Sequence, residues 1–238
     1  MKKEQQWLPP EVVPMDRRTI VIGAGTTAAA MAHAVEALWP VDAPLSGIVV
    51  TPERQQTLRP SGLAPRIEVV EVAHPVPDAR SADNARRMLA LVQGLSQKDV
   101  VLCLMSGAGP ELLTLPVAPL TVAEKQRIVH ELLQRRASTA EMDCVRRHLS
   151  LIRGGRLAAA CAPAQVVTLA LDDGPAGAMS CPTQPDTSTC NDALAVLQRY
   201  GIELPDAVLS LLRHGELETP KPWSDVFANH RLHVIATR

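Results

Sequence analysis

The sequence predicts an α/β fold, a three-layer α/β/α sandwich around a mostly parallel, Rossmann-like sheet, and three observations support it. Short apolar runs of strand length alternate along the chain with amphipathic stretches of helix length. Residues 100–105 are apolar throughout, as expected of a central parallel strand that is buried on both faces. Two of the apolar runs end in glycine-containing turns, at residues 23–27 and 106–109, from which a helix is expected to begin.

The expected strands are short and rich in Val, Ile and Leu. They are residues 19–22, 47–51, 67–72, 100–105, 166–171 and 232–236. The segments between them are long enough for the right-handed crossovers that join parallel strands. We therefore expect a single sheet of about five or six strands.

The expected helices occupy most of the connections between the strands. They are residues 26–38, 82–95, 121–136, 139–149, a segment that begins near 155, 192–199 and 205–213. Thr121 and Glu124 have the spacing of a capping box, which marks the start of a helix. Residues 1–16 are polar and interrupted by prolines, so we expect an N-terminal arm followed by a single α/β domain over residues 17–238.

The composition excludes several classes of function. The 238 residues carry a net charge of −1 and only 2% aromatic side chains, so neither a basic surface nor a base-stacking platform for nucleic acid is expected. No apolar run approaches the roughly 18 residues of a membrane span, and the first residues lack a signal peptide. Five scattered cysteines without a C-x-x-C pair are typical of reduced thiols, so we expect a cytoplasmic protein.

The turn after the first strand has the loose G-x-G-x-x-A pattern of a nucleotide-binding turn. Gly23 and Gly25 would allow a phosphate to approach the backbone, and Thr27 would present its N–H at the start of the helix. Glycines of an ordinary turn explain the pattern equally well. The acidic residue that a dinucleotide site needs after the second strand would be Glu53, which follows a proline in a loop and is a poor match.

A second glycine-containing turn follows the apolar run at residues 100–105. Ser106, Gly107 and Gly109 lie at the carboxyl end of this strand, where open α/β sheets bind their ligands. We interpret these three residues as a second phosphate-binding segment. The alternative is a strand-to-helix turn in which Glu111 complements the helix dipole.

Basic residues gather around a Gly154–Gly155 break. They are Arg146, Arg147, His148, Arg153 and Arg156. This density of cationic and titratable groups at a helix break suits an anionic ligand better than a core, although a solvated basic face has the same composition.

The segment that carries these residues also resembles a known family. Residues 144–157 are similar to the Cys-Val-Arg-Lys-His-Leu-Ser-x-Ile-Lys-Gly-Gly-Arg-Leu signature of the glycerate 2-kinases that are also labelled hydroxypyruvate reductases or MOFRL-family proteins. Residues 23–32, 74–78 and 106–113 resemble the family's Gly-x-Gly-Lys-Ala-Ala, His-Pro-x-Pro-Asp and Ser-Gly-Gly-Gly-Ser-Ala-Leu-Leu segments. The resemblance extends from about residue 19 to residue 236.

The resemblance implies a function and a set of site residues. The family transfers a phosphoryl group from ATP, with Mg²⁺, to the 2-hydroxyl of D-glycerate, mainly by positioning and charge stabilisation. Thr26, Arg147 and Asp172 would stand at catalytic positions, with Asp172 also holding the metal. The residues implied to contact a small anionic, glycerate-like substrate are His74, Arg146, His148 and Arg156.

Departures from the family pattern weaken this expectation. Thr26 stands where the family has a phosphate-facing lysine, and Pro110 and Glu111 replace a serine and an alanine in the second turn. The resemblance covers the family's N-terminal domain, and the 238 residues contain no counterpart of its C-terminal domain. We therefore expect a truncated or degenerate glycerate 2-kinase relative that is weakly active or inactive by itself.

Two other functions stay open at this point. The chain could be a non-catalytic binder of an anionic metabolite or partner protein, or an NAD(P)-dependent hydroxypyruvate reductase. The sequence is compatible with a homodimer and with a separate chain that supplies the family's second domain. It predicts no nucleic-acid and no membrane partner.

Overall fold

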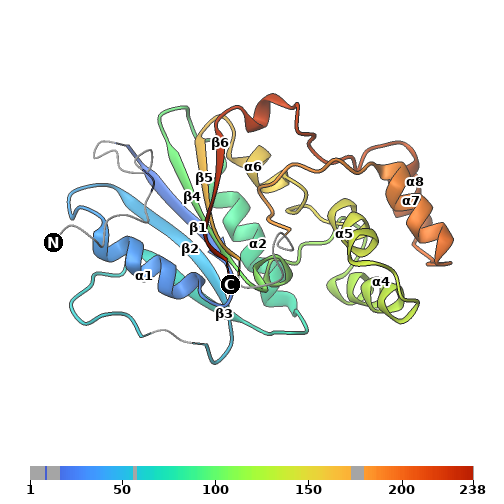
Figure 1. The fold of residues 1–238 in the computed structure, drawn as a ribbon, viewed down its shortest axis with the longest axis horizontal. Coiled ribbons are helices and arrows are strands. Elements are labelled where there is room, and N and C mark those ends of the chain that lie inside the picture. The colour runs from blue at the N-terminus through green and yellow to red at the C-terminus, as the bar shows by residue number, and fades with distance from the viewer. Residues whose placement is uncertain (1–8, 10–16, 56–57, 173–179, 238) are drawn as a thin grey trace.

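A computed structural model describes residues 9, 17–55, 58–172 and 180–237 of the chain. The expected N-terminal arm, residues 1–16, lies outside these residues apart from Pro9, and so does the side chain of Asp172. Figure 1 shows a twisted sheet with helices on both faces and a group of further helices at one side of it. Among the described residues, no helix combines the length and apolar character needed to cross a bilayer.

The sheet has six strands, all parallel, in the order β3-β2-β1-β4-β5-β6. The strands are β1 (Thr19–Ala24), β2 (Leu45–Pro52), β3 (Ile67–Val72), β4 (Val100–Ser106), β5 (Gln165–Asp172) and β6 (His230–Thr237). The predicted α/β fold and the predicted strands are thus confirmed. The order reverses between β1 and β4, and crevices at such switch points bind ligands in open α/β sheets.

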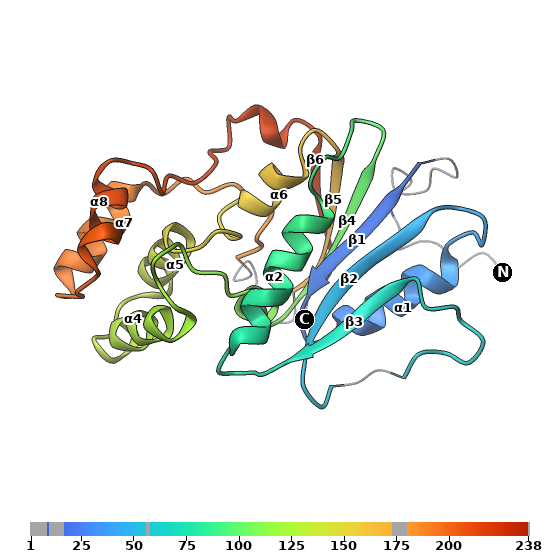
Figure 2. The same ribbon diagram turned by 180° about the vertical axis from the view of Figure 1, so that it is seen from behind.

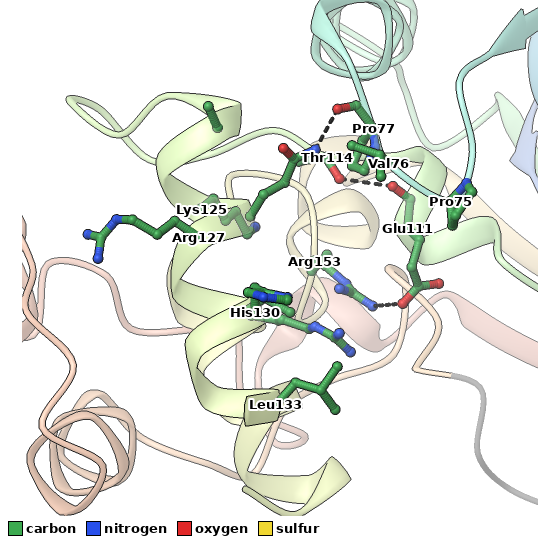
Figure 3. Close-up of a pocket in the computed structure, with 14 residues that line it drawn as sticks. Pro75, Val76, Pro77, Glu111, Thr114, Lys125, Arg127, His130, Leu133 and Arg153 are labelled. Carbon is green, nitrogen blue, oxygen red and sulfur yellow. Dashed lines mark hydrogen bonds and ion pairs between the residues drawn. The ribbon is translucent and has the colours of Figure 1, made fainter. Parts of the chain in front are cut away.

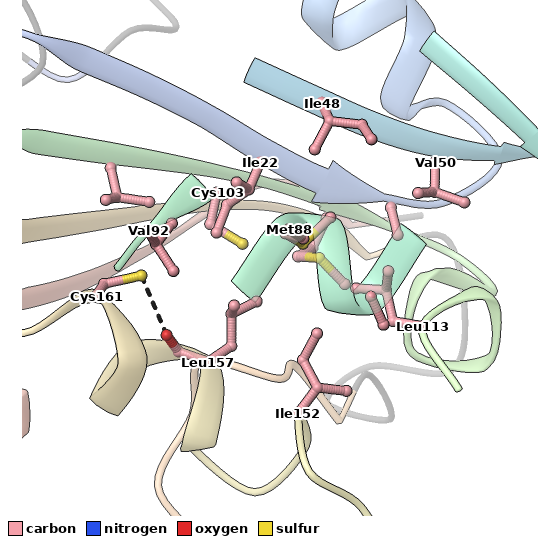
Figure 4. Close-up of a cluster of buried hydrophobic side chains, with 14 of the residues drawn as sticks. Ile22, Ile48, Val50, Met88, Val92, Cys103, Leu113, Ile152, Leu157 and Cys161 are labelled. Carbon is pink, nitrogen blue, oxygen red and sulfur yellow. Dashed lines mark hydrogen bonds between the residues drawn. The ribbon is translucent and has the colours of Figure 1, made fainter. Parts of the chain in front are cut away.

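Two apolar clusters cover the two faces of the sheet. On one face, helix α1 (Ala28–Leu38) packs against β1, β2 and β4 through residues such as Met31 and Val35. On the other face lie α2 (Ala79–Leu91), the short α3 (Gly109–Leu112) and α6 (Arg156–Cys161). Figure 4 shows Met88, Leu157 and Cys161 beneath Ile22 and Cys103 in this second cluster.

The strand β4 is central and buried, as its unbroken apolar run predicts. All seven of its residues are buried, because α1 covers one face and the cluster around Met88 covers the other. All five cysteines are free and buried. Burial raises the pKa of the Cys161 thiol to about 12, so this thiol stays protonated and inert at neutral pH.

Four helices form a separate group that we call the helical lobe. They are α4 (Val122–Gln134), α5 (Thr139–His148), α7 (Cys190–Arg199) and α8 (Asp206–Arg213). Their apolar faces share a third core that includes Ile128, Leu132 and Val145. Figures 1 and 2 show the lobe beside the sheet and not on one of its faces, so these helices do not add to the sandwich layers that the sequence predicts.

Capping boxes define where three of the lobe helices begin. The predicted box of Thr121 and Glu124 is present at α4, and equivalent boxes stand at α5 and α7. The 3₁₀ turn η2 (Asp225–Phe227) precedes β6.

The expected loop between β2 and β3 is anchored by one buried carboxylate. Glu36 of α1 is 2% exposed, pairs with the guanidinium of Arg59 and accepts hydrogen bonds at 2.7 Å from the backbone N–H groups of Arg66 and Ile67. These three partners compensate for the burial of the charge. The loop is thereby held against the side of the sheet.

Candidate functional site

The two glycine-containing turns predicted as phosphate-binding segments meet at the switch point of the sheet. β1 and β4 are neighbours, so the turns that follow them leave the same edge side by side. The N–H of Thr26 donates to the carbonyl of Gly107 at 2.9 Å, and the N–H of Thr27 donates to Oγ of Ser106 at 3.0 Å. The two predicted segments therefore lie side by side in the structure.

These two hydrogen bonds change the expected role of the turns. The N–H groups of Thr26 and Thr27 would have to contact a phosphate in a nucleotide-binding turn. Here both donate within the protein, and Ser106 is fully buried. In this structure Oγ of Ser106 and the N–H of Thr27 therefore satisfy each other, and a contact of either group with a phosphate stays a prediction.

The glycines of the two turns allow close packing of backbones. A Cβ on Gly23 would lie 2.1 Å from the carbonyl oxygen of Leu104, and one on Gly109 would lie 2.4 Å from that of Ala24. Gly25 has a φ of +140°, and a Cβ there would lie 2.2 Å from Oγ of Ser106. Gly23, Gly25 and Gly109 are buried, and their lack of a side chain lets the two turns touch, while their contact with a phosphate stays a prediction.

The part of the crossing that faces solvent is small. Thr26, Thr27, Gly107 and Ala108 are partly exposed there. Oγ1 of Thr27 is buried and has no hydrogen-bond partner in the structure. These residues are the accessible part of the predicted nucleotide-binding segment.

A cavity of about 530 Å³ opens between the sheet and the helical lobe. One wall is formed by the loop after β3, at Pro75, Val76 and Pro77, and by Glu111 and Thr114 after β4. The opposite wall is α4 with Arg146 of α5 and Arg153. The walls are joined by a hydrogen bond from the Gln126 amide to the carbonyl of Pro77 and by the contact of Arg153 with Glu111.

Three cationic side chains with incomplete pairing line this cavity, and we call it the cationic cavity. Lys125 and Arg153 are each 5% exposed, and Arg146 is half-buried. Arg153 lies 3.5 Å from a carboxylate oxygen of Glu111, and Arg146 lies 3.4 Å from one of Asp143. Both distances are long for a charge-assisted hydrogen bond. Figure 3 shows Lys125 and Arg153 beside the same space.

Lys125 is the residue of this cavity that sequence reasoning missed. It lies on the buried face of α4 with Ile128 and Leu132, at the i, i+3, i+7 spacing of an apolar stripe. A lysine on that stripe is the signal that could have found it. Burial, followed by the charges of Arg153 and Arg146, lowers the pKa of Lys125 well below its usual 10.5.

The basic cluster around Gly154 divides into two groups. Arg146 and Arg153 face the cationic cavity, whereas Arg147, His148 and Arg156 belong to a polar network inside the lobe. Nε of Arg147 lies 3.1 Å from Oδ1 of Asp186, which is 3% exposed. Arg147, predicted as catalytic, is thus paired within the protein and does not line the cavity.

His148 and Arg156, predicted to bind substrate, hold the same network together. His148 is fully buried, with Nδ1 2.9 Å from the carbonyl of Cys144 and Nε2 3.4 Å from Glu218. The guanidinium of Arg156 donates to the carbonyls of Arg147 and Leu217 at 3.1 and 2.7 Å. In this structure these side chains join α5 and α6 to the segment before β6, and their contact with a substrate stays a prediction.

Glu218 is the acidic centre of this network. Burial raises its pKa, but hydrogen bonds from Lys221 and from the N–H groups of Cys190 and Thr219 outweigh burial and lower it to about 2. One atom each of His148, Cys190 and Glu218 lie within 4.8 Å of one another, which is close enough to share a metal ion. However, Glu218 already has the ammonium group of Lys221 as its partner, so the network is satisfied without a metal.

Two further predicted residues lie apart from the cavity. His74 is exposed on the loop after β3 and does not line the cavity, although the prolines that follow it do. Asp78 caps α2 by accepting a hydrogen bond from the N–H of Arg80. The backbone of Asp172 closes β5 at the same sheet edge as Ser106, while its predicted metal-binding side chain lies outside the described residues.

The chain has relatives that match its sequence. It is 46% identical over 208 residues to a putative hydroxypyruvate reductase of Agrobacterium vitis, covering 86% of this chain and 46% of that protein. It is 41% identical over 172 residues to the D-glycerate 2-kinase of Thermotoga maritima, covering 71% of this chain and 40% of that protein. The chain thus spans about half the length of the curated relatives it matches.

The fold and a family model lead to the same group of proteins. The crystal structure of glycerate kinase from Thermotoga maritima superimposes with a TM-score of 0.81 at 36% identity, covering 92% of this chain and 51% of that one. A family model described as "Domain of unknown function (DUF4147)" matches residues 2–213. A match over this much of the sequence establishes that the chain belongs to the DUF4147 family.

Proposed function

We propose that this chain forms the part of a glycerate 2-kinase-like phosphotransferase that binds a small anionic hydroxy acid. One observation carries the proposal. The turns after β1 and β4 touch at the switch point, and the β4 turn leads directly into Glu111 at the wall of a cavity that holds Lys125, Arg146 and Arg153. The names of its relatives, a D-glycerate 2-kinase among them, agree with it.

The residues around the cavity suit the positioning of an acid. Arg146 and Arg153 would bind and orient a carboxylate, since guanidinium groups match carboxylate geometry. Pro75, Val76 and Pro77 give the cavity one apolar wall. The reaction moves the γ-phosphoryl group of ATP to the 2-hydroxyl of D-glycerate, with ADP as the leaving group, and depends on positioning and charge.

ATP and Mg²⁺ would be the co-substrate and the metal of this reaction. Thr26, Thr27 and Gly107 are the accessible residues of the switch point that would face the phosphates. Asp172 at the end of β5 would hold the metal, which neutralises the phosphate charge when bound. Thr26 brings no charge to this place, and the N–H groups of both threonines are already in use, so we expect weak nucleotide binding.

A reductase function has less support from the arrangement of side chains. Dinucleotide binding needs an acidic residue after the second strand to bind the ribose. The residue in that place, Glu53, lies 2.6 Å from the guanidinium of Arg80 and is paired with it. Two relatives are named putative hydroxypyruvate reductases, so reductase activity should be measured directly.

The test is a comparison of binding and turnover with the purified 238-residue chain. Calorimetry should detect D-glycerate, and a coupled assay with Mg-ATP should give turnover well below the roughly 1 s⁻¹ of competent kinases. Oxidation of NADH by hydroxypyruvate should be absent. The proposal would be overturned if the chain bound neither D-glycerate nor Mg-ATP. Binding without turnover under any condition would favour a non-catalytic binder. Oxidation of NADH would favour the reductase.

A further inference from the structure

The ammonium group of Lys125 has an environment that no structural role explains. Lys125 is 5% exposed, and within residues 17–55, 58–172 and 180–237 its ammonium group makes no hydrogen bond or ion pair. Its Nζ is not among the fully buried atoms without a partner, so it keeps some contact with the open cavity. Burying an unpaired ammonium group is costly, and lysines are seldom fully buried without a partner. Figure 3 shows Lys125 reaching from α4 toward the space that Glu111 and Arg153 also face.

We propose that the cationic cavity is a binding site for a carboxylate monoanion, held by Lys125, Arg146 and Arg153. Its bound partner supplies the counter-charge that Lys125 lacks. The proposal deepens the proposed function, because it names the subsite and the chemical class of group that occupies it. The carboxylate site does not require the kinase activity, because it concerns binding of a carboxylate and not phosphoryl transfer.

The charges around the cavity favour a monoanion over a phosphate dianion. Arg146 and Arg153 are balanced in number by Asp143 and Glu111, which lie 3.4 and 3.5 Å from them. The surplus in the cavity is therefore the single positive charge of Lys125 when it is protonated. One carboxylate neutralises that charge, whereas a dianion would leave the cavity with an excess negative charge beside Glu111.

The other charged groups near Lys125 leave this count unchanged. Arg127 lines the cavity but is paired with Glu131 on α4 at 2.5 Å. Arg156 of α6 acts on Lys125 through its charge alone, because its guanidinium donates to backbone carbonyls away from the cavity. His130 lines the cavity from the exposed side of α4 and contacts Gln134 at 2.9 Å.

Binding of an anion should therefore be linked to uptake of a proton. Burial and the neighbouring arginines lower the pKa of Lys125 in the empty cavity. A carboxylate in contact favours the charged amine and raises that pKa, so the amine takes up a proton on binding. The affinity for the carboxylate should fall as pH rises between these two pKa values, because binding then requires a proton from solution and the proton concentration decreases.

The remaining walls of the cavity include uncharged, apolar side chains. Pro75, Val76 and Pro77 on one side and Val129 and Leu133 on the other offer no charge. A cavity of about 530 Å³ with these walls accepts a carboxylate on a short carbon chain with room to spare. The carboxylate, and not the chain, then determines where the ligand lies.

The experiment measures binding of D-glycerate, D-lactate and inorganic phosphate by calorimetry, in buffers of different ionisation enthalpy and from about pH 6 to 10. Both carboxylates should bind with uptake of up to about one proton, and phosphate should bind more weakly. Lys125→Met should weaken carboxylate binding about 10- to 100-fold, as expected for loss of one charged partner. Lys98→Met, an exposed lysine at the other end of β4, is the matched control and should change nothing.

A second variant keeps the result independent of folding defects. Lys125→Arg retains a positive charge that cannot be released in this pH range, so it should bind carboxylate without proton uptake and without the pH dependence. The proposal would be overturned if Lys125→Met left carboxylate binding unchanged, or if the wild-type chain bound no carboxylate at all. It would also be overturned if binding took up no proton at any pH, or if phosphate bound more strongly than the carboxylates. Failure of the proposed function has a separate readout, because carboxylate binding with proton uptake can persist when Mg-ATP gives neither binding nor turnover.

Discussion

The backbone N–H of Thr27 donates to Oγ of Ser106 across the switch point of the sheet, at 3.0 Å. Thr27 belongs to the turn after β1, and Ser106 is the last residue of β4. Together with the bond from Thr26 to Gly107, it holds the two turns in one arrangement. The predicted phosphate-binding turns are therefore coupled to each other before any ligand is considered.

Ser106→Ala tests this coupling. Ser106 is fully buried, so its loss leaves the N–H of Thr27 without an acceptor and should lower the free energy of unfolding by about 1–3 kcal/mol. Urea denaturation provides the measurement. Ser46→Ala, at an exposed position of β2, should change it by less than about 0.5 kcal/mol. Equal effects of the two substitutions would show that the bond contributes nothing measurable.

Glu218 should make stability depend on acid pH. Its pKa is lowered to about 2 because the hydrogen bonds from Lys221, Cys190 and Thr219 outweigh burial. A carboxyl whose pKa is lower when folded stabilises the protein above its unfolded pKa of about 4.5, and this contribution is lost as pH falls toward 2.

The measurement is thermal unfolding at a series of pH values between about 6 and 3, for wild type and Glu218→Gln. The variant should be less stable than wild type at pH 6, and the difference between the two should shrink as the pH falls. Glu216→Gln, an exposed neighbour, serves as the control and should keep the wild-type slope. A wild-type slope in Glu218→Gln as well would contradict the assignment.

Thr26→Lys should strengthen the binding of Mg-ATP. The side chain is partly exposed at the switch point, and a cation there would face the phosphates that the proposed function places beside it. A gain on the order of 1 kcal/mol, about five- to tenfold in affinity, is expected at a partly buried site. Calorimetry measures it, and Gln97→Lys, which adds the same charge before the start of β4, should have no effect. An equal gain in affinity in the control would show that the effect comes from the net charge of the protein and not from the position of the lysine.

The fold was largely predictable from the sequence, whereas the division of the basic cluster was not. The run at residues 100–105 and the box of Thr121 and Glu124 were correct because each depends on local periodicity or on a three-residue spacing. Successive residues of a helix point about 100° apart, so Arg146 reaches the cavity while Arg147 turns to Asp186. Which of them would meet a ligand depended on how the helical lobe packs.

The same dependence explains why the sequence located the turns but could not show what they contact. Glycines beside a strand end indicate a close approach to the backbone, and the sequence does not say whether a phosphate or another turn approaches. Here Gly23 and Gly109 meet backbone carbonyls of β4 and β1. Lys125 escaped notice for a related reason, because a single lysine on an apolar stripe has no motif around it.

Lys125→Met should raise stability while it weakens binding at the proposed carboxylate site. Burial, then Arg153 and Arg146, lowers the pKa of Lys125 below 10.5 in the folded protein, so the unfolded chain holds its proton more tightly. Between the two pKa values the unfolded chain binds more protons, and the free energy of unfolding of wild type rises with pH up to about 10.5.

Methionine has a similar length and no charge to bury, so the variant should be more stable by about 1–3 kcal/mol at pH 7. Its advantage should shrink toward pH 10, and the exposed Lys98→Met should show neither effect. Urea denaturation at pH 7 and near pH 10 measures the free energy of unfolding of the variant and of wild type. A variant that is less stable at both pH values would mean that the ammonium group has a structural partner and is not free to bind a ligand.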